Sequence, residues 1–224
     1  GIGANAFANR VEITSVVIPE GVIDLGANAF SSCSSLVDID FPSTLRKIGS
    51  DCFAGCSKLL SADLPEGLES LGGFAFVDCS SLEEVNFPSS LERIERYMFR
   101  FCRNLVRVNI SEGVRGIHDH VFEYCSGLGK IVIPSSIEYI QSGAFAECVN
   151  LREVIFMGNA PQVDDIFQKL PGDAKVKVNS GLSGFDDFYS GVKVIKYPTL
   201  SISEPLYLEH WLGDDYVDPG YEAL

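Results

Sequence analysis

Residues 82–104 read LEEVNFPSSLERIERYMFRFCRN, and this 23-residue stretch decides the fold because its pattern recurs along the chain. Each unit opens on an apolar residue and later carries a phenylalanine, which in most units precedes a cysteine by three residues. The phenylalanines are Phe7, Phe30, Phe53, Phe76, Phe99, Phe122 and Phe145. The cysteines are Cys33, Cys56, Cys79, Cys102, Cys125 and Cys148. A fixed period of this length predicts a solenoid, in which each coil buries its apolar face against its neighbours.

Each unit begins with a predicted strand, and six full units run over residues 13–150. In the unit that opens at Leu36, the apolar Ile39 lies between Asp38 and Asp40, an alternation typical of a half-buried strand. A proline follows most of these strands and ends them, because proline has no amide hydrogen to donate to the next ladder bond.

The second half of each unit predicts a corner and a short helical piece. Gly26, Gly49 and Gly72 follow a short apolar pair, and we expect them to adopt positive φ at a tight corner. The Ala-Phe-x-x-Cys segment is too short for a full helix. We therefore expect one helical turn or a 3₁₀ piece there, which would carry the phenylalanines and cysteines into the core.

The chain has seven cysteines, six of which occupy one position of successive units. Stacked coils place equivalent residues about 5 Å apart with parallel side chains, an arrangement that does not suit disulfide geometry. We therefore predict a row of buried free thiols that pack as small apolar groups. A metal site is not expected, because the sequence has no CxxC pair and the row has no histidine partners.

The strand, corner and Ala-Phe-x-x-Cys motifs together resemble the BspA-like leucine-rich repeats of microbial cell-surface proteins, from residue 1 to about residue 198. The resemblance implies an α/β repeat fold that is mostly β. This fold would be a right-handed, curved leucine-rich-repeat solenoid with a parallel sheet on one face and short helical or 3₁₀ turns. It also implies bacterial secretion or cell-surface display, and adhesion to host proteins or to other cells, without a cofactor.

The decay of the repeat divides the chain. We expect a truncated repeat at 1–12, the solenoid at 13–158, a C-terminal cap at 159–198, and a tail or the start of an immunoglobulin-like domain at 199–224. The last expectation rests on residues 215–223, which resemble the opening of such domains in bacterial surface proteins. Because no capping turn precedes the first repeat, we also expect the chain to begin inside a longer array.

Charge and composition exclude several classes of function. A net charge of −14 argues against a nucleic-acid partner, which requires a basic surface, and no apolar run is long enough for a transmembrane helix.

His118 and His120 form a pair without a third metal ligand in view, so we interpret them as surface histidines. Repetition places one residue type in rows, whereas catalysis needs different groups that converge, so no enzyme activity is expected. Phe101 and Tyr124 are interpreted as packing residues.

The concave face of the predicted sheet is the candidate binding surface, because solenoids present extended surfaces there. Its outward positions form two rows. The first row is Ser15, Asp38, Ser61, Glu84, Arg107, Lys130 and Glu153, and the second is Val17, Asp40, Asp63, Asn86, Asn109, Val132 and Ile155. The candidate ligand-binding residues are an acidic patch at Asp38, Asp40, Asp63 and Glu84, then Asn86, a basic spot at Arg107 and Lys130, and an exposed apolar end at Val132 and Ile155.

Two functions are compatible with this pattern. The first is a non-enzymatic recognition module, secreted or on the cell surface, that binds host or cell-surface proteins or glycans through the repeat surface. The second is a structural spacer without a ligand of its own, in which the same rows are solvated strand faces.

Overall fold

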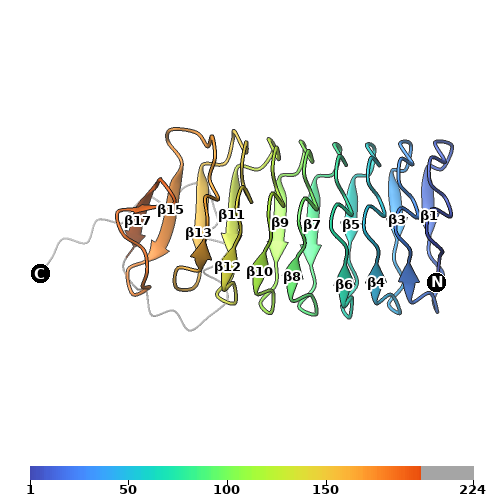
Figure 1. The fold of residues 1–224 in the computed structure, drawn as a ribbon, viewed down its shortest axis with the longest axis horizontal. Coiled ribbons are helices and arrows are strands. Elements are labelled where there is room, and N and C mark those ends of the chain that lie inside the picture. The colour runs from blue at the N-terminus through green and yellow to red at the C-terminus, as the bar shows by residue number, and fades with distance from the viewer. Residues whose placement is uncertain (198–224) are drawn as a thin grey trace, which may run out of the picture.

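The computed structural model describes residues 1–197, which form a row of coils stacked side by side along one axis (Figure 1). Each coil contributes one long strand to the same side of the stack. The long strands are β1 (Ser15–Val17), β3 (Asp38–Asp40), β5 (Ser61–Asp63), β7 (Glu84–Phe87), β9 (Arg107–Ile110), β11 (Lys130–Ile133), β13 (Glu153–Phe156), β15 (Lys175–Asn179) and β17 (Val192–Tyr197). The tail or immunoglobulin-like start expected at 199–224 lies outside the described residues.

Neighbouring long strands pair in parallel, and their register equals one repeat. Asp38 of β3 pairs with Ser15 of β1, and Asp63 of β5 pairs with Asn86 of β7. The ladder is interrupted between β3 and β5 and between β9 and β11, although these strands still lie side by side. The parallel sheet predicted for the strand segments is confirmed.

A second set of very short strands runs along the other side of the stack. These strands are β2 (Asp24–Leu25), β4 (Lys47–Ile48), β6 (Ser70–Leu71), β8 (Arg93–Ile94), β10 (Gly116–Ile117), β12 (Tyr139–Ile140) and β14 (Gln162–Val163). They form two parallel sheets, β2-β4-β6 and β8-β10-β12-β14. The sequence indicated only one sheet, because a two-residue strand such as Lys47–Ile48 is too short to show alternation.

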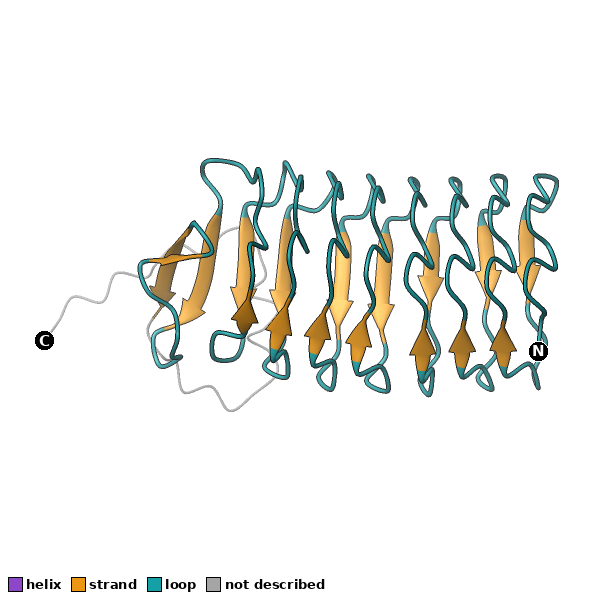
Figure 2. Ribbon diagram, viewed as in Figure 1, coloured by secondary structure: helices purple, strands orange, loops and turns teal. Residues whose placement is uncertain are grey.

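The predicted helical turn is wrong: the described residues contain strands, turns and loops but no α- or 3₁₀-helix (Figure 2). Two residues in each such segment have positive φ, for example Asn28 at 58° and Ser32 at 59°, and a left-handed residue cannot continue a right-handed helix. Alternate amides consequently leave the segment. Phe30 donates to the carbonyl oxygen of Cys52 in the next coil at 2.8 Å, whereas Cys33 donates back to Phe30 at 3.2 Å.

The corner glycines also differ from expectation, because Gly26, Gly49 and Gly72 do not have positive φ. Glycine is required there for space. A Cβ on Gly49 would lie 2.5 Å from the amide nitrogen of Ala27, and one on Gly72 would lie 2.4 Å from that of Ser50. The coils approach closely at this corner, and a backbone atom cannot move aside as a side chain can.

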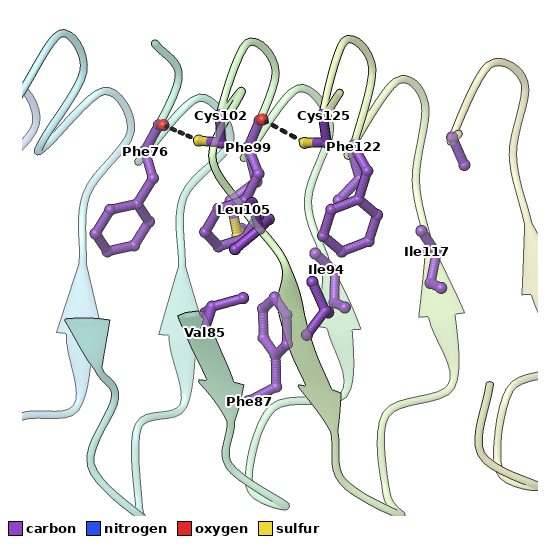
Figure 3. Packing of buried hydrophobic residues seen from close by; sticks show 14 of the residues in the cluster. Phe76, Val85, Phe87, Ile94, Phe99, Cys102, Leu105, Ile117, Phe122 and Cys125 are labelled. Carbon is purple, nitrogen blue, oxygen red and sulfur yellow. Dashed lines mark hydrogen bonds between the residues drawn. The ribbon is translucent and has the colours of Figure 1, made fainter. Parts of the chain in front are cut away.

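The core is a continuous stack of equivalent side chains (Figure 3). The phenylalanine rings from Phe7 to Phe145 lie 5.1–5.8 Å apart between centroids, in offset-stacked geometry. All seven cysteines are buried free thiols, which confirms the prediction. The Cys56 thiol, for example, donates to the carbonyl oxygen of Phe30 at 3.2 Å, so each turn is also held to the preceding coil.

The last described residues are less regular. The short strand β16 (Phe188–Tyr189) pairs antiparallel with β17. Phe185 and Tyr189 are buried, with ring centroids 5.2 and 5.3 Å from that of Phe156. The Tyr189 hydroxyl donates to the carbonyl oxygen of Pro161 at 2.8 Å. These rings extend the core beyond the last regular coil.

Candidate functional site

The two predicted rows lie on the outer side of the long strands. Ile39 is 5% exposed, whereas Asp38 and Asp40 on either side of it are exposed to solvent. The strand registers then align each row from coil to coil. We call the following residues the long-strand surface: Ser15, Val17, Asp38, Asp40, Ser61, Asp63, Glu84, Asn86, Arg107, Asn109, Lys130, Val132, Glu153 and Ile155.

Three carboxylates at one end of the long-strand surface have no ion pair with any of the described residues: Asp38, Asp40 and Asp63. Asp63 accepts a long hydrogen bond from the amide of Asn86 at 3.5 Å, and Asn86 accepts one from Asn109 at 2.6 Å. Like charges on adjacent strands repel one another. This end of the surface therefore carries negative charge that the described part of the chain does not neutralise.

Beyond the acidic end, the long-strand surface is largely self-neutralised, which corrects the predicted grouping. Glu84, expected in the acidic patch, forms an ion pair with Arg107 in the next coil, with 2.7 Å between Oε2 and Nε. Glu153 is paired with Lys177 in the coil that follows it. Arg107 is therefore not an isolated basic spot, and the acidic patch consists of three residues.

The predicted exposed apolar end is wrong at Ile155. This side chain is 1% exposed, and Val132 beside it is partly buried. Alternation correctly places Ile155 in the outward row, in register with Val132 and Lys177, but it does not predict what covers a side chain. The exposed apolar residue of the surface is instead Val17, at 73%.

A second group of side chains, which the sequence interpretation missed as a group, occupies the left-handed positions of the turns. One such column holds Asn5, Asn28, Asp51, Phe74, Tyr97, His120 and Gly143, and the other holds Asn9, Ser32, Gly55, Asp78, Phe101, Tyr124 and Glu147. Asparagine, aspartate and glycine suit this conformation, whereas an aromatic residue there costs roughly 1–2 kcal/mol. Comparing the columns across repeats would have revealed the change to rings.

The rings in these columns stack along the solenoid. Phe74 and Tyr97 lie 4.9 Å apart, Tyr97 and His120 lie 5.0 Å apart, and Phe101 and Tyr124 lie 4.9 Å apart. All five residues are partly exposed. Phe101 and Tyr124 therefore pack on each other, as interpreted from the sequence, but each ring also has a face or edge exposed to solvent.

One of the two histidines, His120, belongs to this ring network, whereas His118 contacts a different ring. His120 stacks on Tyr97, and its Nδ1 lies 3.5 Å from a carboxylate oxygen of Glu123. Nε2 of His118 lies 3.1 Å from the hydroxyl oxygen of Tyr139. Among residues 1–197, no cluster of three or more histidine, cysteine, aspartate or glutamate residues could hold a metal ion. Within that range, no helix is long and apolar enough to span a membrane.

Coils of one repeat each, with a parallel sheet of long strands and a second set of short strands, define the class of parallel β-solenoids. The chain belongs to the BspA type leucine-rich repeat family. The repeat region of this family, with six copies of the repeat, matches residues 1–128 and 46–170. A comparison with functionally curated proteins finds no match.

Solved structures of bacterial leucine-rich repeat proteins have the same fold. The T. pallidum leucine-rich repeat protein is 30% identical, with a TM-score of 0.61, and the match covers 67% of this chain and 70% of that one. A leucine-rich cell surface protein from Faecalibacterium prausnitzii is 24% identical, with a TM-score of 0.63, and the match covers 88% of this chain and 64% of that one. For a leucine-rich repeat protein from Eubacterium ventriosum, the identity is 25%, the TM-score is 0.59, and the coverage is 62% of this chain and 38% of that one. The chain therefore spans only part of these relatives.

Proposed function

We propose that the chain is a non-enzymatic recognition module, secreted or displayed on a bacterial cell surface, that binds a host or cell-surface protein or glycan through the long-strand surface. The observation that carries the proposal is the cluster of Asp38, Asp40 and Asp63, which are exposed on adjacent strands without an ion pair in residues 1–197. A basic patch on a partner would relieve the repulsion among these carboxylates and would steer the encounter electrostatically.

The strands that carry this cluster form a preorganised base. Ile39 and Ala62 alternate with the outward aspartates and are buried in the same core cluster as the stacked phenylalanines, so β3 and β5 are anchored on their inner side. A rigid surface loses little conformational entropy when a partner binds. The proposed display on the cell surface is supported by the F. prausnitzii relative, which is described as a cell surface protein.

The alternative is a structural spacer. The unbroken phenylalanine stack favours it, because stacked coils form a rod that can hold another domain at a distance. In that case the three aspartates serve only solubility, and reversing their charge should have no effect on binding.

Charge reversal separates the two functions. Wild type and the Asp40→Lys/Asp63→Lys variant are compared on an array of extracellular-matrix proteins and glycans. Glu69→Lys/Glu92→Lys is the matched control, because these two carboxylates are also exposed in adjacent coils but lie beside the short strands. A hit lost only in the aspartate variant supports recognition through the long-strand surface. A wild-type chain that binds nothing on the array favours the spacer.

A further inference from the structure

The ladder of short strands has one break, between β6 and β8, within residues 1–197. On one side of the break, the amide of Gly72 donates to the carbonyl oxygen of Ile48 at 2.9 Å. On the other side, the amide of His118 donates to the carbonyl oxygen of Ile94 at 3.0 Å. The equivalent bond from Glu95 to Leu71 is not made in the described structure. The ladder of short strands is therefore interrupted between these two coils.

The break falls where the corner residue changes. Gly26, Gly49 and Gly72 pack against the preceding coil at distances that leave no room for a Cβ, whereas the next two coils place Glu95 and His118 at this position. The turn beyond the corner is still joined across the break, since Phe74 donates to the carbonyl oxygen of Arg96 at 3.1 Å. The interruption is therefore local to the corner, and the stack of coils continues past it.

A hollow of about 450 Å³ lies at this corner, a volume within the range of small-ligand sites. Its wall is predominantly polar, unlike the usual apolar pocket. The residues that matter here are Ser70, Phe74, Glu95, Arg96, His118 and Asp119. Together they supply hydroxyl, carboxylate, guanidinium and imidazole groups around one aromatic ring.

Phe74 supplies the apolar element of the hollow. Its ring stacks on Tyr97, and the guanidinium carbon of Arg96 lies over it, 6.0 Å from the ring centroid. The preceding coil holds Asp51 in this column, so the ring stack ends at Phe74 within the described residues. The backbone of Phe74 has a φ of 61°, a strained conformation for an aromatic residue, and such strain concentrates at functional sites. Asn28 shows that the same turn forms with a residue that suits the conformation.

We propose that this hollow is a carbohydrate-binding site that takes a hexopyranose unit of a glycan. One face of a pyranose ring is lined by C–H groups and can pack on the ring of Phe74, while its rim carries hydroxyls that both donate and accept hydrogen bonds. Arg96 donates, the carboxylates of Glu95 and Asp119 accept, and Ser70 does both. Glu95 also lies 3.4 Å from Arg93 and 3.8 Å from His118, so it is held in place beside the hollow. An apolar peptide side chain would displace water from these polar groups without offering them hydrogen bonds, which is costly.

This site is separate from the long-strand surface. The hollow is lined by β6 and the corners that follow the short strands, whereas Asp40 and Asp63 lie on β3 and β5. Loss of one site should not affect the other, so the two proposals can fail independently.

The test is binding of the chain to immobilised neutral, carboxylated and sulfated oligosaccharides. Phe74→Asn removes the ring and places asparagine at a φ that Asn28 already adopts, so the variant should fold with a Tm no lower than that of wild type. Phe101→Asn is the matched control: Phe101 also has positive φ and also stacks on one tyrosine, and asparagine occurs in its column as Asn9. Phe101 does not line the hollow.

We expect wild type and Phe101→Asn to bind the same sugar class, and Phe74→Asn to bind it about tenfold more weakly or not at all. Phe74→Tyr, which keeps a ring, should retain binding. Equal binding by wild type and Phe74→Asn would overturn the proposal. Binding of no oligosaccharide by the folded wild-type chain would overturn it as well, including the case in which the chain binds only proteins.

Discussion

The thiol of Cys102 donates a hydrogen bond to the carbonyl oxygen of Phe76, 26 residues earlier in the chain, with 3.2 Å between sulfur and oxygen (Figure 3). The same bond recurs from Cys33 to Cys148, each time to the phenylalanine of the preceding coil. The cysteine row therefore has two roles. It fills the core with small side chains, and it gives each phenylalanine carbonyl a second hydrogen bond from the next coil, in addition to the one from the amide three residues further along its own turn.

Burial of these thiols predicts that they react slowly with thiol reagents and that the protein is less stable at high pH. Desolvation raises the pKa of Cys56 from 9.0 to about 12, and that of Cys148 to about 12 as well. Thiol reagents should react slowly with the native protein and quickly after denaturation, because the thiolate is the nucleophile. As the pH rises above 9, unfolded thiols ionise while native ones do not, so the free energy of unfolding should fall. Thiol counting and urea titrations at several pH values test this, and disulfides in the native protein would contradict it.

The phenylalanine stack predicts a graded cost of truncation. Phe76→Ala should destabilise the protein by about 3–5 kcal/mol, because Phe76 is fully buried between two rings and leaves a cavity. Phe7→Ala should cost clearly less, since that side chain is 40% exposed and has one stacked neighbour in the described chain. Chemical denaturation of both variants gives the comparison. Equal costs would argue against a linear stack.

Close approach of the coils predicts that Gly49 cannot be replaced. Gly49→Ala places a Cβ 2.5 Å from the backbone nitrogen of Ala27. We therefore expect the free energy of unfolding to fall by about 1–3 kcal/mol because of overpacking. Gly129→Ala is the control, because its Cβ would meet only the carbonyl oxygen of Asn150, at 3.9 Å. Thermal melts of the two variants should therefore differ. Similar melts would mean that the corner is looser than the structure shows.

Asp51 predicts a stabilising substitution with a defined pH dependence. Desolvation raises the pKa of this carboxyl above 3.8, so its ionised form is disfavoured in the native state. Asp51→Asn removes that charge, nearly preserves the shape, and suits the φ of 57°. The variant should be more stable than wild type at pH 7, and part of the gain should disappear as the pH falls through the native pKa, because wild-type Asp51 then becomes neutral too. A gain that does not change with pH would assign the effect to the backbone alone.

The sequence predicts the parts of this fold that repeat. Period and alternation place Ile39 inside and Asp38 and Asp40 outside, because the side-chain direction in a strand depends only on its register. The same reasoning puts the phenylalanine and cysteine rows into the core. These features follow from local geometry, and each coil repeats them.

The errors arise where contact between coils, rather than the local pattern, decides the structure. The turn around Phe30 is not helical because half of its amides bond to the next coil, which a single repeat does not reveal. Gly49 is needed for space and not for positive φ. Ile155 points outward as predicted and is nevertheless covered, and Glu84 leaves the acidic patch because Arg107 lies beside it.

The central claim is that the acidic end of the long-strand surface binds a partner, and isosteric neutralisation tests it most directly. The affinity of wild type for the partner found on the array is compared with that of Asp40→Asn/Asp63→Asn, with Glu69→Gln/Glu92→Gln as control. We predict that the aspartate variant binds about tenfold more weakly or worse, that the control binds as wild type does, and that salt weakens the wild-type interaction. Equal affinities for all three proteins would contradict the claim.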